Sequence, residues 1–277
     1  MKRMAALLRP VRGGLFAFSV SLALLGGGAK MCFAEELPVD AALVLAVDVS
    51  SSMQPAELAL QRQGYAAAFR SRDVVDAIRD GAYGRVAVTY VEWGSSNAHR
   101  VVLPWTLIDG AATAAMVADR LEATRIATMF RTSISGAIRV GMRSLDDMRF
   151  NASRRIIDIS GDGPNNEGGP VEFARDTAVR AGITVNGLPI MVKPILPVGG
   201  QKLPPLDAYY ADCVAGGERA FVLPVTNWQQ FPPAVRRKLV MEVSGRDPAI
   251  RYAAANGSPD MLLPGKGADC EIGEEFP

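Results

Sequence analysis

The sequence contains few of the residues on which many metal and redox sites depend. Its 277 residues include one histidine, His99, and three cysteines. A single histidine excludes multi-histidine zinc or iron sites and leaves one candidate base for a serine or cysteine triad. Three cysteines cannot build a disulfide scaffold. A Gly-rich phosphate loop, a CxxC pair and a GxSxG elbow are also missing, so the sequence carries no common signature of nucleotide, thiol-redox or α/β-hydrolase chemistry.

Charge of one sign is scarce as well. The chain has 30 basic and 29 acidic side chains, a formal charge of +1, which excludes a strongly basic nucleic-acid-binding protein. Its apolar content of 49% is enough to fill a core, and its charged content of 21% argues against disorder. Five of the basic residues and none of the acidic ones lie in residues 1–34, so the remainder has 25 basic and 29 acidic side chains, a charge of −4.

Residues 1–34 have the pattern of a secretory signal peptide. Four basic residues precede an apolar run over residues 15–25, and small residues follow it up to Ala34. Eleven apolar residues are too few for a membrane-spanning helix, which needs about 20. We therefore expect cleavage after Ala34 and a periplasmic or secreted protein without a membrane span, with an uncleaved anchor as the alternative. Outside the cytoplasm Cys213 and Cys270 can form a disulfide, although the sequence does not show whether they come within bonding distance.

The rest of the chain alternates strand and helix patterns. Apolar, β-branched runs predict strands over residues 41–49, 85–93, 100–105, 154–160, 183–190 and 219–225. Helices are predicted over residues 55–70, 111–123, 133–148, 171–180 and 232–243. This alternation predicts an α/β fold, a Rossmann-like three-layer αβα sandwich with a mostly parallel central sheet. We place the domain at residues 39–243 and a flexible C-terminal tail at residues 244–277, which are rich in glycine, proline and acidic residues.

Polar side chains follow the first and fourth predicted strands. Asp48, Ser50 and Ser52 end the first strand, and Asp162 follows the fourth. If the strand order is the common 3-2-1-4-5-6, these strands meet at the switch point where ligands bind, and Thr132 at a helix start can lie beside them. Oxygen ligands of this kind suit a hard cation, Mg²⁺ first, with Mn²⁺ or Ca²⁺ as alternatives. An ion held mainly by hydroxyls stays electrophilic and can accept a carboxylate from a partner.

These residues resemble a known motif. Asp48-x-Ser50-x-Ser52, then Thr132, then Asp162-Gly163 is similar to the metal-ion-dependent adhesion site of von Willebrand factor type A domains, and the resemblance covers about residues 39–243. It implies that the first three residues form the first metal loop, Thr132 the second and Asp162 the third. The loop continues with two asparagines, Asn165 and Asn166, which depart from the usual pattern and either add a ligand or reshape the mouth of the site.

Several longer segments resemble a narrower group. These are GYAAAFR, VTYVEW, RTSISGAI, SGDGPNN, LDAYYADCV and VRRKLV. They are similar to exported bacterial type A-like proteins of the domain of unknown function 1194. This second resemblance supports the fold and the export but implies no particular ligand.

The sequence predicts a non-enzymatic, exported module that captures a carboxylate of a protein or peptide partner through Mg²⁺, with no role in nucleic-acid binding. Two alternatives stay open. A metal-dependent hydrolase would use Asp48 and Asp162 around the same ion, with only the serines and the remote His99 as candidate nucleophile or base. A type A fold with a vestigial site is the other.

Several other polar residues are expected to be structural. Asp158 lies within the fourth strand and is interpreted as a hydrogen-bond acceptor outside the site. The basic run at residues 236–238 is interpreted as a solvated helix face, where positive charge suits the end of a helix dipole. His99 is placed in a solvated loop, and Tyr209 and Tyr210 fit packing better than recognition.

Overall fold

The computed structural model describes residues 36–193, 204–245 and 267–271. The predicted signal peptide lies outside these residues, as does the predicted tail apart from residues 244, 245 and 267–271. Among the described residues, no helix combines the length and the apolar character that crossing a membrane requires.

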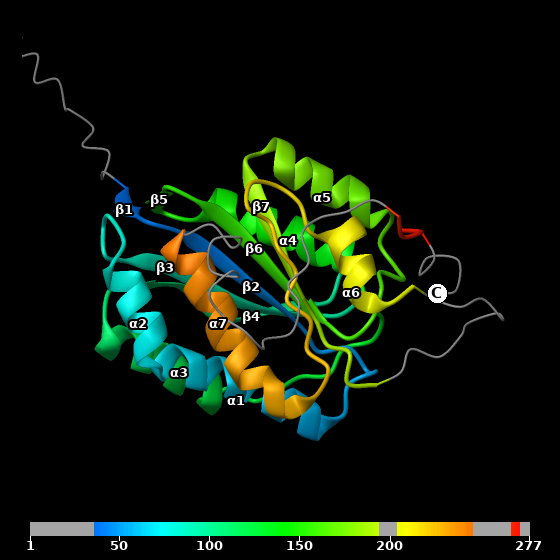
Figure 1. Ribbon diagram of the computed structural model, residues 1–277, viewed down its shortest axis with the longest axis horizontal. Coiled ribbons are helices and arrows are strands. Elements are labelled where there is room, and N and C mark those ends of the chain that lie inside the picture. Colours follow the sequence, from blue (N-terminus) through cyan, green and yellow to red (C-terminus); the bar gives the residue numbers. More distant parts are fainter. Residues whose placement is uncertain (1–35, 194–203, 246–266, 272–277) are drawn as a thin grey trace, which may run out of the picture. The chain divides into compact units, whose positions relative to one another are not determined.

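A five-stranded sheet forms the centre of the domain (Figure 1). Its strand order is β4-β3-β2-β6-β7, with each neighbouring pair parallel except β3 and β4. The strands are β2 (Ala42–Asp48), β3 (Val86–Trp93), β4 (His99–Ile108), β6 (Arg155–Gly161) and β7 (Ile183–Pro189). Two short strands, β1 (Leu37–Val39) and β5 (Phe150–Ala152), pair separately.

The observed order matches the expected order for the first five predicted strands. Every residue of β2 is buried, as a continuous apolar run covered by helices on both faces requires. The sixth predicted strand, residues 219–225, is wrong: Val222 and Val225 form only isolated bridges, to Gly187 and Ile190. The ladder is interrupted because Pro189 of β7 has no N–H to continue the pairing toward Leu223, although Leu223 and Val225 still donate to the carbonyls of Gly187 and Pro189.

Helices cover both faces of the sheet, which confirms the three-layer sandwich (Figure 1). One apolar core lies beneath α1 (Pro55–Arg70), α2 (Arg72–Arg79), α3 (Ala111–Ala123) and α7 (Phe231–Ser244). A second core lies beneath α4 (Ile134–Asp147), α5 (Val171–Arg180), α6 (Leu206–Tyr209) and the π-helix η1 (Tyr210–Val214). A 3₁₀ turn, η2 (Trp228–Gln230), precedes α7. Sequence patterns missed α2, α6, η1 and η2, which are all short.

The two cysteines that the sequence left open do pair. Cys213 of η1 forms a disulfide with Cys270, 57 residues later. Nearby, the backbone N–H of Ala268 donates to Asp212 Oδ2 at 2.6 Å. Residues 267–271 are therefore attached to the domain, although they belong to the segment predicted as a flexible tail.

Candidate metal site

Four of the five predicted site residues form one chain of hydrogen bonds at the carboxyl ends of β2 and β6. The backbone N–H of Ser50 donates to Asp48 Oδ1 at 2.7 Å, and the hydroxyls of Ser50 and Ser52 are 2.9 Å apart. Ser52 Oγ in turn donates to Asp162 Oδ1 at 2.6 Å. Asp48 at the end of the central strand β2 is therefore linked through two serines to Asp162, which follows the neighbouring strand β6.

Thr132 reaches the same end of the sheet through the segment before α4. Met129 forms a parallel bridge with Ser50, and its N–H donates to Val49 O at 2.8 Å. Three residues later, the buried Thr132 donates its own N–H to Asn166 Oδ1 at 2.9 Å. The second loop is thus joined to the first loop by backbone pairing and to the third loop by an asparagine.

The two asparagines join the loop after β6 to the start of α4 through hydrogen bonds. Asn165 Oδ1 accepts from the N–H of Ser135 at 3.0 Å, and its Nδ2 donates to Gly169 O at 3.1 Å. Asn166 Oδ1 likewise accepts a hydrogen bond, from the N–H of Thr132. Of the two readings that the sequence left open, these contacts favour shaping of the mouth over direct ligation.

The two carboxyls of the site interact electrostatically. Burial, and then the nearby Asp162, raise the pKa of Asp48 from 3.8 to about 8, and burial also raises the pKa of Asp162. Within the described part of the chain, Asp48 Oδ2 is buried without a hydrogen-bond partner. Two carboxyls, one of them with an unpaired oxygen, and the two serine hydroxyls form a donor set that fits a hard divalent ion.

Carboxylates alone do not make this a metal site. Across residues 36–193, 204–245 and 267–271, no group of three or more His, Cys, Asp or Glu side chains could hold an ion. Any ion bound at this end of the sheet would depend on hydroxyl oxygens as well.

Sequence reasoning missed three residues at this site: Gly161, Lys193 and Tyr210. A Cβ at position 161 would lie 3.0 Å from Asp48 Oδ2 and 2.8 Å from Tyr210 Oη, so glycine is what lets β6 end against β2. A glycine ending a buried strand is a signal of such a close approach. Lys193 Nζ donates to Ser52 O at 3.0 Å and pairs with Glu57 at the rim, and no sequence pattern marks it.

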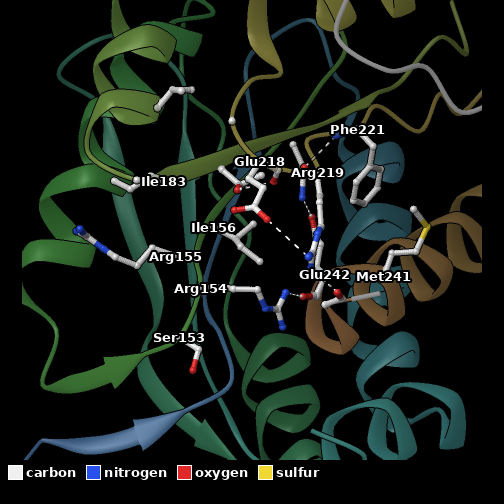
Figure 2. A pocket seen from close by; sticks show the side chains of 16 residues that line it. Ser153, Arg154, Arg155, Ile156, Ile183, Glu218, Arg219, Phe221, Met241 and Glu242 are labelled. Carbon is white, nitrogen blue, oxygen red and sulfur yellow. Dashed lines mark hydrogen bonds and ion pairs between the residues drawn. The ribbon is translucent and has the colours of Figure 1, made fainter. Parts of the chain in front are cut away.

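A separate cavity of about 460 Å³ lies beside the first residues of β6 and β7, at the opposite end of these strands (Figure 2). Two of its arginines bind backbone carbonyls: Arg154 contacts the carbonyls of Glu242 and Val243, and Arg219 contacts that of Gly245. These contacts satisfy the last carbonyls of α7. The cavity shares no residue with the predicted motif.

Comparison with protein families gives one match, over residues 38–247, to the family described as "Protein of unknown function (DUF1194)". Comparison with curated proteins finds no match.

Solved structures show the fold. Proximal thread matrix protein 1 from the mussel byssus is 16% identical with a TM-score of 0.54, over 76% of this chain and 49% of that one. A von Willebrand factor type A protein from Catenulispora acidiphila is 16% identical with a TM-score of 0.52, over 74% and 43%. The mussel protein has also been solved "with zinc occupied MIDAS motif" (17% identity, TM-score 0.54, over 76% and 49%). The chain thus spans about half the length of the first of these proteins, and the likeness confirms the type A fold.

Proposed function

The chain belongs to the DUF1194 family, and from this premise we propose that it is an exported, metal-dependent protein-binding module. The observation that carries the proposal is the hydrogen-bonded chain from Asp48 through Ser50 and Ser52 to Asp162, with a buried oxygen of Asp48 that has no partner among the described residues. It lies at the switch point of an open α/β sheet, where such folds bind ligands.

The proposed ligand set comprises two carboxylates and three hydroxyls, from Asp48, Ser50, Ser52, Thr132 and Asp162. When bound, Mg²⁺ or a similar hard cation offers an open position to a carboxylate oxygen of a protein or peptide partner. The chain's own part is to hold the oxygens in place: Ser50 N–H orients Asp48, and Ser52 orients Asp162. Zinc in the adhesion-type site of the mussel protein supports a metal at the equivalent end of this fold.

Export is proposed on two observations. Residues 1–34 have the composition of a signal peptide. The disulfide between Cys213 and Cys270 is of a kind that persists in oxidising compartments such as the periplasm.

A non-enzymatic role is supported by the position of the single histidine. His99 is exposed and begins β4, which corrects its expected place in a loop. It is in register with Trp93, which is in register with Asp48. Two strand spacings, about 10 Å, therefore separate His99 from the site. A general base needs hydrogen-bond reach to the group it deprotonates, so the hydrolase alternative lacks this candidate.

Mg²⁺ should stabilise the protein, and Asp48→Asn should abolish that effect. An ion present at 100 times its Kd adds about 2.7 kcal/mol to the free energy of unfolding, since it binds only the folded state. The amide of the variant keeps an acceptor for Ser50 N–H but cannot contribute charge to the ion. Thermal denaturation with increasing Mg²⁺ measures the shift in Tm.

The matched control for this experiment is Asp119→Asn, because Asp119 is an exposed carboxylate whose ion-pair partner in the described part of the chain is Arg70. It should respond to Mg²⁺ as the unmodified protein does. A Tm of Asp48→Asn that rises with Mg²⁺ as much as that of the control would contradict the ligand assignment. Capture of a partner from periplasmic extract that requires both Mg²⁺ and Asp48 then identifies the ligand.

A further inference from the structure

Two buried oxygens without partners face the same space beside the candidate metal site. Among the described residues, Asp48 Oδ2 and Tyr210 Oη both lack a hydrogen-bond partner, and both side chains are fully buried. A Cβ placed on Gly161 would come within 3.0 Å of the first oxygen and 2.8 Å of the second. The two oxygens therefore approach the same point beside Gly161, which only a residue without a Cβ permits.

Tyr210 is held firmly in this position. It is the first residue of η1, and π-helical turns of this kind are frequent at functional sites. Cys213 of the same turn is bonded to Cys270, and Arg175 donates to the carbonyl of Asp212 at 2.7 Å. The preceding Tyr209 accepts at its Oη from the N–H of Asn165, in the third loop of the site, at 3.2 Å. The helix that carries Tyr210 is thus attached both to the disulfide and to the loop that follows β6.

A buried hydroxyl without a partner is unfavourable, and a structure that keeps one has a reason for it. Packing alone would be met by phenylalanine, which has the same ring and no polar atom to satisfy. The hydroxyl of Tyr210 can donate, whereas a carboxylate oxygen can only accept, so the two unpaired groups are complementary. Because both oxygens approach the same point beside Gly161, a small movement would bring the hydroxyl to the carboxylate, directly or through one water.

We propose that Tyr210 is a positioning residue for Asp48, donating its hydroxyl to Oδ2 directly or through one water when a cation occupies the site. Ser50 N–H already holds Oδ1, so a second hydrogen bond at Oδ2 fixes the plane of the carboxylate. Groups that orient a metal ligand in this way typically change metal affinity 10–100-fold when they are removed. The inference rests on the proposed function, because it assumes that a cation binds beside Asp48.

Tyr210→Phe should have opposite effects on the protein with and without metal. Without metal the variant loses a hydroxyl that has no partner in the described part of the chain, so its Tm should be equal to or higher than that of the unmodified protein. With metal it should bind Mg²⁺ and Mn²⁺ at least tenfold more weakly. Isothermal titration with each ion gives the affinity directly, and thermal denaturation in EDTA gives the stability.

Tyr65→Phe is the matched control. Tyr65 lies in α1 on the other face of the sheet, is equally buried, and also has an Oη without a partner among the described residues. The same chemical change there should leave the affinity for both ions unchanged. A merely structural role for Tyr210 would make the two variants behave alike.

Gly161→Ala provides a second test that keeps Tyr210. Its methyl group would fill the space between the two oxygens, and it should weaken binding of both ions to a similar degree. Unchanged affinity in Tyr210→Phe, while the unmodified protein binds Mg²⁺, would overturn this inference alone. An unmodified protein that binds neither ion would overturn the proposed function, and this inference with it.

Discussion

Replacing Lys238 with methionine is expected to lower the free energy of unfolding by about 3–5 kcal/mol. Lys238 lies in α7 with no exposed surface, and its Nζ is 2.8 Å from Asp158 Oδ1 and also contacts Glu242. Both carboxylates are buried, and Asn186 donates to Glu242 at 2.8 Å. Removing the cation leaves two carboxylates facing each other in the interior. Urea denaturation of the variant and the unmodified protein measures the difference.

Arg236→Met, two residues earlier in the same helix, is the control for this variant. Arg236 is half exposed and lies 3.5 Å from Asp73, which is also exposed. Ion pairs of this kind contribute about 0–1 kcal/mol. If the two variants lost the same amount of stability, the buried cluster would have no special role. A loss confined to Lys238→Met would confirm that the cluster, and not the general charge of α7, is what stabilises the fold.

The deficit of Lys238→Met should grow with pH. Burial raises the pKa of Asp158 to about 7, although Lys238 lowers it. A carboxyl with a raised pKa stabilises the fold fully below its unfolded value, 3.8, and loses that contribution as the pH rises through 7. Without Lys238 the lowering influence is gone, so the variant must either keep this proton or bury an unpaired charge. Denaturation at pH 5 should show a small deficit and at pH 8 a large one; equal deficits would contradict the assignment.

The parts of the fold that the sequence predicts are those set by local pattern. A continuous apolar run such as residues 41–49 indicates a strand covered on both faces, because few other structures bury every residue of such a run. Strands alternating with helices then restrict the topology to a few right-handed arrangements. The motif from Asp48 to Ser52 could be placed at the carboxyl edge of the sheet for the same reason, before its contacts with Asp162 were known.

The parts that the sequence does not predict depend on contacts between distant segments. The run at residues 236–238 is interpreted as solvated, and the structure corrects this for Lys238, which is buried. Its partner Asp158 comes from β6, 80 residues earlier, so no local pattern distinguishes it from Arg236. Tyr210 also could not be identified from the sequence. Its proposed role depends on its position beside Gly161 and Asp48, which are distant in the sequence and come together only in the folded protein.

Breaking the Cys213–Cys270 disulfide is expected to destabilise the protein by about 4 kcal/mol, because the bond closes a loop of 57 residues in the unfolded chain. Reduction of the unmodified protein tests this without creating a cavity at the buried Cys213. Once residues 1–34 are removed, Cys213 and Cys270 are the two cysteines that remain, so this bond alone responds to the reductant. Urea denaturation with and without reductant gives the difference, and a change below about 1 kcal/mol would contradict the expected contribution.

Reduction should also weaken metal binding, and this second effect separates the disulfide from a general cross-link. Cys213 lies in η1 with Tyr210, and Tyr209 Oη donates to Cys270 O at 3.4 Å while accepting from Asn165 in the third loop. Freeing η1 therefore loosens a hydrogen bond to the site and the tyrosine beside Asp48 together. Reduced Tyr210→Phe is the informative comparison: if the bond acts on the metal through Tyr210, reduction should lower the Mg²⁺ affinity of the unmodified protein more than that of the variant. Equal losses in both would mean that the disulfide acts through Asn165 and its loop instead.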